Sequence, residues 1–255
     1  MRLDRSVFTF YDRVAVSGVV LVGTAMALFV VLGSLGGDRT APGLAVVVVL
    51  AAAIGWLIVK RPHRGRPIAF VVGVLALPYF ANDPLRLTHP GSAVDFVPMT
   101  LAAAGTLAAA VGSGISLVEH RRGSVRVPSG AERWTFRAAV VVLFAIEVFS
   151  VSATLAGRTR AATIEGVTVL VAERSRFRPD DIEVTGDDVG VLVRNTDWVA
   201  HTFVIDELAL DVYVGPRSDR MIAIPVAAAG RYRFVCTVVG HLGMDGSIEI
   251  TPDVP

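Results

Sequence analysis

A cysteine, a histidine and a methionine lie close together in the C-terminal stretch from Arg231 to Ile250. Cys236 is the only cysteine of the chain, and it precedes His241 by five residues and Met244 by eight. Thiolate and thioether sulfurs are soft donors and imidazole is borderline, so the set suits copper, which alternates between a soft cuprous and a harder cupric state. A trigonal copper centre needs one more imidazole.

An upstream histidine can supply that imidazole. His201 follows the turn-prone stretch 195–197 and begins an alternating run typical of a β-strand. A single cysteine on a strand is more often a buried small hydrophobic residue, and its spacing to His241 alone is weak evidence for a metal. Joined by Met244 and His201, the pattern favours a copper site.

These residues resemble the ligands of the cupredoxin (type 1 blue copper) family, of the plastocyanin and amicyanin kind. In that family one histidine follows an Asn-containing turn, and cysteine, histidine and methionine come from the loop before the last strand. The resemblance covers roughly residues 165–252 and includes 177–184, which looks like the entrance to the second strand of the family. The ligands that it implies for one Cu(I)/Cu(II) ion are His201, Cys236, His241 and an axial Met244.

The resemblance also implies a route for electrons. In cupredoxins the imidazole edge at the position of His241 emerges through an apolar patch on which redox partners dock. Val238, Val239 and Leu242 would supply that patch here. The expected partner is therefore a redox protein that docks near His241.

The family pattern further points to residues that tune the copper. Met244 would help to set the reduction potential. Hydrogen bonds around the ligands tune such sites, and Asn195 and Thr202 are the candidates to make them.

Composition divides the chain into two parts. Hydrophobic residues make up 53% of it and the mean hydropathy is +0.60, an excess that lies in the first 157 residues. Residues 1–157 hold 14 basic and 8 acidic side chains, a net charge of +6, whereas 158–255 hold 10 and 15, a net charge of −5. This contrast indicates a basic membrane part and an acidic soluble domain. No basic stripe suggests nucleic acid as a partner, and one cysteine allows neither an internal disulfide nor a two-cysteine binuclear copper site.

Apolar runs predict five membrane spans. A span needs about 20 residues to cross the hydrocarbon core, and the first run is too long for a cleaved signal peptide, so it is expected to stay as an anchor. The third run is short and contains Pro78. The predicted spans are about 14–36, 41–59, 67–82, 96–118 and 138–157.

The basic residues predict the orientation of these spans. With five spans, the N-terminus, a basic loop at 60–66 and the 119–137 region fall on one side, while the opposite loops carry only Arg39 and Arg86. Lys and Arg collect in short cytoplasmic loops. The N-terminus is therefore expected in the cytoplasm and the C-terminal domain on the extracytoplasmic side of the cell membrane.

Two features of the apolar runs suggest helix packing. Gly and Ala recur in 102–114, and small residues permit close approach of helices in lipid. The fourth helix is thus expected to pack centrally, although a compositional bias with 23 Arg and one Lys explains the pattern equally well. Glu147 lies inside the fifth run, where we favour a hydrogen bond to another helix over a proton path.

Beyond a short polar linker at 158–165, the pattern becomes β from 166 to 255. Short runs divided by Gly, Pro, Asp and Asn predict seven or eight strands and a Greek-key sandwich. Period-two alternation turns Phe234 and Cys236 inward and Arg231 and Arg233 outward. The predicted fold class is therefore mixed: a five-span α-helical transmembrane bundle in 1–157, then an all-β cupredoxin sandwich.

These observations predict a membrane-anchored blue copper protein that mediates one-electron transfer at a mononuclear site. Protein ligands fill every position at the copper, and the five histidines of the chain do not provide the further clusters that a multicopper oxidase or nitrite reductase requires. We therefore expect no enzymatic activity. The alternative is a copper-binding module for acquisition, delivery or sensing, with the helices as transporter or scaffold.

Overall fold

The computed structural model of the chain describes residues 8–36, 41–81, 87–156, 167–185, 189–224, 229–238 and 240–251. They fall into two compact units. The first comprises Met1–Val31, Pro42–His89 and Phe96–Phe149, and the second comprises Leu32–Ala41, Pro90–Asp95 and Ser150–Pro255. The linker predicted at 158–165 lies outside the described residues.

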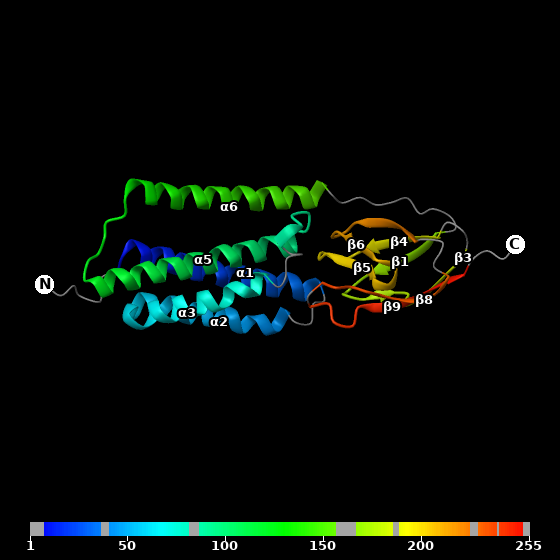
Figure 1. Ribbon diagram of the computed structural model, residues 1–255, viewed down its shortest axis with the longest axis horizontal. Helices are drawn as coiled ribbons and strands as arrows, with labels where there is room; N and C mark the ends of the chain where they lie inside the picture. Colours follow the sequence, from blue (N-terminus) through cyan, green and yellow to red (C-terminus); the bar gives the residue numbers. More distant parts are fainter. Residues whose placement is uncertain are drawn as a thin grey trace. The chain divides into compact units, whose positions relative to one another are not determined.

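Long helices make up the N-terminal part of the described chain (Figure 1). Three of them, α1, α5 and α6, are long and apolar enough to cross a membrane. By contrast, α2 has only 16 residues and α3 contains Pro67 and Pro78. The helices are α1 (Phe10–Gly36), α2 (Ala45–Lys60) after the short η1 (Ala41–Leu44), α3 (Pro62–Ala81), α5 (Ala93–Arg122) and α6 (Gly130–Ala156).

The basic stretch 60–66 is not the loop that we expected. Helix α2 ends at Lys60 and α3 begins at Pro62, so Arg61 alone connects them. Proline is favoured at the first position of a helix, where its missing N–H is not needed. The two helices form a tight hairpin. They approach so closely that a Cβ added at Gly65 would clash with the backbone of Ile58.

A buried ion pair explains why part of this basic stretch is helical and hidden. Arg66 is only 2% exposed and donates from Nε and Nη2 to the two carboxylate oxygens of Asp12 in α1, each at 2.7 Å. Ser116 of α5 donates to the same carboxylate at 2.8 Å. A charge that is removed from water requires such a partner. The start of α1, the start of α3 and the end of α5 are thereby held together.

Helices α1 and α5 touch through glycines, as the small residues of 102–114 predicted. A Cβ at Gly105 would lie 2.6 Å from the carbonyl oxygen of Gly18, and one at Gly112 would lie 2.7 Å from the backbone nitrogen of Ala15. Among the three helices that are long and apolar enough to cross a membrane, α5 has the largest buried share. The small residues of α5 therefore allow it to pack closely against α1.

Glu147 makes the interhelical hydrogen bond that we favoured. Its Oε1 accepts a hydrogen bond from the hydroxyl of Thr100 in α5 at 2.6 Å. This contact joins α6 to α5 within the first unit.

Two β-sheets pack face to face in the second unit, which confirms the predicted sandwich. One sheet has the order β2-β1-β4-β7 and the other β3-β9-β8-β5-β6. The pairs β1 with β4 and β3 with β9 are parallel, and the remaining pairs are antiparallel. The strands are β1 (Thr168–Ala172), β2 (Phe177–Arg178), β3 (Asp181–Thr185), β4 (Val189–Asn195), β5 (His201–Ile205), β6 (Leu210–Val214), β7 (Asp219–Ile224), β8 (Gly230–Val235) and β9 (Asp245–Thr251).

The core between the sheets follows the predicted alternation. Phe234 is fully buried, and its ring stacks on Phe203 with 5.1 Å between ring centroids. Arg231 and Arg233 point outward and pair with Asp181 of β3 and Asp245 of β9. Cys236 packs against the core, although β8 ends one residue before it, so the sulfur lies on the first residue of the loop.

Candidate metal centre

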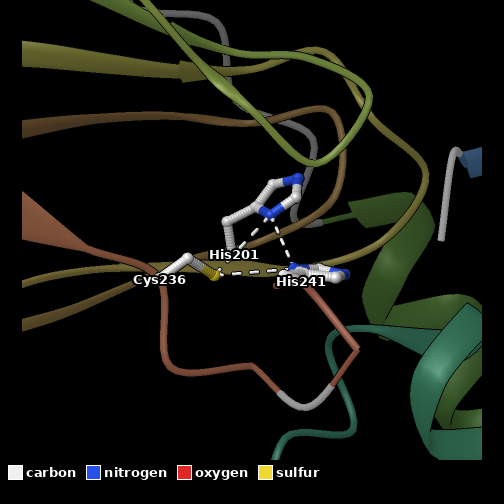
Figure 2. Close-up of side chains that lie close together, drawn as sticks. All are labelled: His201, Cys236 and His241. Carbon is white, nitrogen blue, oxygen red and sulfur yellow. Dashed lines mark hydrogen bonds between the residues drawn. The ribbon is translucent and has the colours of Figure 1, made fainter. Parts of the chain in front are cut away.

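Strand pairing brings the predicted ligands to one end of the sandwich. His201 is the first residue of β5, and Cys236 follows the last residue of β8. These strands are antiparallel neighbours, with Val204 opposite Val235. The start of one strand therefore lies beside the end of the other, and the loop after β8 carries His241 to the same place (Figure 2).

The three side chains point their donor atoms toward one another (Figure 2). The Nδ1 atoms of His201 and His241 are 3.1 Å apart. The Sγ of Cys236 lies 3.5 Å from Nδ1 of His241 and 3.9 Å from Nδ1 of His201. Among the described residues, these form the group of histidine, cysteine and acidic side chains able to hold a metal.

The spacing of these atoms fits a metal ion. In zinc sites, bonds of about 2.0 Å to nitrogen and about 2.3 Å to sulfur are typical, and a trigonal arrangement with such bonds separates the ligand atoms by about 3.5 Å. The observed separations, 3.1 to 3.9 Å, bracket that value. Two imidazoles and a thiolate are also the donor set that blue copper sites use.

Met244 lies on the same loop, and backbone hydrogen bonds fix its position. The N–H of Cys236 donates to its carbonyl oxygen at 2.9 Å, and its own N–H donates to the carbonyl of His241 at 3.2 Å. Positive φ angles at Gly240 and Gly243, which glycine adopts without strain, turn the chain on either side of His241. The side chain of Met244 is buried in the core beside Cys236, and its role as an axial ligand stays a prediction.

Thr202 makes the hydrogen bonds to the sulfur that the family pattern suggested. Its backbone N–H donates to Sγ of Cys236 at 3.4 Å, and its hydroxyl lies 3.8 Å from the same atom. That hydroxyl also accepts from the backbone N–H of Thr237 at 2.8 Å. One residue thus supports the thiolate and fixes the start of the ligand loop.

Asn195 acts on the loop rather than on a ligand. Its side-chain amide donates to the carbonyls of Val199, Val214 and Gly215 at 2.8, 3.2 and 2.9 Å. Its Oδ1 accepts from the backbone N–H of Asp197 at 2.8 Å. Asn195 therefore reaches the ligands through Asp197, which contacts His201, and its role in tuning the copper stays a prediction.

Asp197 contacts a predicted ligand, which the sequence did not reveal. Its Oδ2 lies 2.9 Å from Nε2 of His201, the ring nitrogen that faces away from Cys236. The stretch 195–197 suggested only a turn. The available signal was a carboxylate four residues before a histidine, but spacing in a loop does not show which side chains turn inward.

The electrostatics of the metal-free cluster favour a charged pair. Burial by itself would raise the pKa of the Cys236 thiol, but the hydrogen bonds and charges of His201 and His241 outweigh it and lower the pKa to about 5. Burial likewise opposes a charge on His201, but its hydrogen bonds with Asp197 and Cys236 raise its pKa to about 9. At neutral pH the site therefore holds a thiolate and an imidazolium.

The ring of His241 is less accessible than we expected. The residue is 4% exposed and Val238 is buried as well. Leu242, the next residue on the loop, is 80% exposed. Val239 lies outside the described residues. Of the apolar patch that the family pattern predicted, Leu242 is the part that lies at the surface.

Comparisons with known proteins find a family match for part of the chain. Residues 139–248 match the profile of a family described as a cupredoxin-like domain. No curated protein matches the chain.

Among solved structures, a reduced Cu(I) form of an amicyanin variant is 15% identical, with 34% of this chain and 85% of that chain covered and a TM-score of 0.30. A copper-containing nitrite reductase from Thermus scotoductus is 17% identical, with coverages of 40% and 26% and a TM-score of 0.30. The metal-binding domain of a Cu(I)-exporting P-type ATPase from Streptococcus pneumoniae is 16% identical, with coverages of 35% and 91% and a TM-score of 0.29.

The family match and the clustered donors lead to the same conclusion. The match includes His201, Cys236 and His241. The C-terminal part of the chain thus matches a cupredoxin-like domain, and His201, Cys236 and His241 lie close together as candidate ligands for one copper ion.

Proposed function

We propose that the protein is a membrane-anchored one-electron carrier with a mononuclear type 1 copper site on the extracytoplasmic side. The observation that carries this proposal is the convergence of two imidazole Nδ1 atoms and one thiolate sulfur within 3.9 Å of one another. A copper ion held by these donors supplies exchange of a single electron between its cuprous and cupric states.

The protein holds the donors nearly fixed, which suits electron exchange. His201 is held by Asp197 on its far side, and Cys236 receives hydrogen bonds from Thr202. Ligands held in this way move little when the oxidation state changes, so little reorganisation precedes electron transfer. With Met244 as the fourth donor, no position stays open for a substrate, which favours a carrier over an enzyme.

Contacts within the helical unit support five spans with alternating direction. The Asp12–Arg66 pair and the hydrogen bond from Ser116 join the starts of α1 and α3 to the end of α5. The hydroxyl of Tyr11 donates to Glu132 at the start of α6 at 2.8 Å. An up-and-down bundle requires these four ends to share one side. The basic segments lie at the same ends, and we assign that side to the cytoplasm because Lys and Arg collect there.

The partner that fits this function is a redox protein. Leu242 presents an exposed apolar side chain next to the ligand His241. Apolar contact around a metal-ligating imidazole would let a partner approach closely without a strong charge on either surface. We therefore propose docking at the ligand loop.

Spectroscopy of the copper-loaded full chain tests the proposal. We expect an intense blue absorption that reductant bleaches reversibly, together with the paramagnetic resonance of a thiolate-bound Cu(II). Cys236→Ser should abolish the charge-transfer band, whereas the neighbouring Thr237→Ser, which keeps its hydroxyl, should retain it. A colourless protein that takes up only Cu(I) would instead support copper acquisition, delivery or sensing.

A further inference from the structure

The carboxylate of Asp197 receives three hydrogen bonds in a buried position. The residue is 6% exposed. Besides Nε2 of His201, its partners are the backbone N–H groups of Arg174 at 2.8 Å and Ser175 at 3.1 Å. Its own backbone is also fixed, because its carbonyl accepts from the N–H of Arg217 at 3.0 Å. Such a carboxylate has little freedom to move away from the imidazole.

The two backbone donors belong to an unusual turn. Arg174 and Ser175 connect β1 to β2 and have φ angles of 51° and 55°. Glu173 and Arg176 exchange both of their backbone hydrogen bonds across this turn, at 2.9 and 3.1 Å. A two-residue hairpin with both central residues in the left-handed region normally uses Asn and Gly. Side chains with a Cβ are disfavoured there, and such outliers gather at functional sites.

Asp197 links the turn to the histidine. In the left-handed conformation, two successive N–H groups point to the same side and form a concave site for an anion. Here that anion is the side chain of Asp197, whose Oδ1 accepts from Arg174 and whose Oδ2 accepts from Ser175 and lies 2.9 Å from Nε2 of His201. The strained hairpin thus supports the orientation of one imidazole.

We propose that Asp197 is a positioning residue of the copper site, an inference that rests on the proposed function. By accepting a hydrogen bond from Nε2–H of His201, it leaves the lone pair on Nδ1, the nitrogen that faces Cys236. A carboxylate behind a ligating histidine fixes its tautomer and makes it a stronger donor. The added negative charge stabilises the cupric form more than the cuprous form, so Asp197 lowers the reduction potential.

The test compares copper-loaded full-length variants. We expect Asp197→Asn to weaken Cu(II) binding by about 10- to 100-fold and Cu(I) binding less. If the ratio of the two affinities changes about tenfold, the potential rises by about 59 mV for one electron. Asp181→Asn removes the same charge from an exposed position and serves as the control. Arg174→Gly with Ser175→Gly keeps both N–H donors in a favourable conformation and should leave the potential unchanged.

A second measurement needs no variant at this position. In the diamagnetic Cu(I) form, nitrogen NMR should show a proton on Nε2 of His201 that exchanges slowly with water. An unprotonated Nε2 of His201 would overturn the proposal. A reduction potential of Asp197→Asn equal to that of Asp181→Asn would overturn it as well. Either result could occur in a protein with a normal blue spectrum. Failure of this inference is therefore distinct from failure of the proposed function, in which the wild type lacks that spectrum.

Discussion

The backbone N–H of Thr202 points at the sulfur of Cys236 from the neighbouring strand, with 3.4 Å between nitrogen and sulfur. Thr202 directly follows the ligand His201 in β5. One short segment therefore supplies an imidazole to the metal and a hydrogen bond to the thiolate. The pairing of β5 with β8 couples the two ligands without any additional element.

Thr202→Val tests the structural part of this arrangement. The change keeps the shape but removes the acceptor of the backbone N–H of Thr237 in a partly buried hydrogen bond, and the loss of such a bond costs about 0.5–1.5 kcal/mol. We expect the free energy of unfolding of the metal-free protein to fall by about that amount, together with a shift of the charge-transfer band in the copper form. Thr185→Val, at an exposed position of β3, should stay within about 0.5 kcal/mol of wild type. Equal stabilities of the two variants would contradict the role of the hydroxyl.

Copper binding should release one proton at neutral pH. Cys236, with a pKa of about 5, is already a thiolate at pH 7, whereas His201, with a pKa of about 9, is still protonated. The metal therefore competes with the proton on His201 in this range. The apparent copper affinity should therefore rise about tenfold per pH unit from pH 7 to about 9 and level off above it. Calorimetry in buffers of different ionisation enthalpy measures the proton, and release of two protons at pH 7 would contradict a preformed thiolate.

The buried pair between α1 and α3 should respond asymmetrically to substitution. Arg66→Met leaves the carboxylate of Asp12 without its charged partner, and breaking a buried pair costs about 3–5 kcal/mol. Adding Asp12→Asn to that variant should recover much of the loss, because no uncompensated charge remains. Unfolding in mixed micelles measures both effects. The exposed Arg121→Met controls for loss of a basic residue, and a double variant no more stable than the single one would show that the pair is not coupled.

The five-span arrangement predicts opposite sides for His63, in the first turn of α3, and His89, which follows α3. In a Cys236→Ser background, His89→Cys should react with an impermeant thiol reagent added to intact spheroplasts. His63→Cys should react only after the membrane is opened. The increase in protein mass on labelling shows, for each variant, whether its cysteine has reacted. Labelling of both from outside, or of neither, would mean that α3 does not cross, and the distribution of basic residues would lose its explanation.

Residue types and spacing were sufficient to predict which side chains cluster. Cys236 and His241 share one loop, and the alternation before Cys236 predicted the strand that places its sulfur against the core. The same reasoning located His201, because a histidine at the start of a strand is visible as a pattern. These features depend on neighbours in the sequence, which is why they could be predicted.

Features that depend on distant partners could not be predicted in this way. From the sequence alone, Arg66 is interpreted as one more basic residue of a loop. Only the structure places it beside Asp12, 54 residues earlier. Asp197 is likewise interpreted as a turn residue. Its side chain points inward because it accepts hydrogen bonds from two backbone amides of a different hairpin, which the local sequence does not show. The two-residue strand β2 is too short for any periodicity. In each case tertiary contacts decided a local conformation that the sequence left open.

The Asp12–Arg66 pair also has a consequence for biosynthesis. A nascent chain that has released only its first helix presents a lone carboxylate, and its counterion is not yet synthesised. Ribosomes must add the whole α2 segment before that charge is neutralised. We therefore expect the insertion machinery to retain the first helix until the third arrives, so that the three enter the bilayer as one unit.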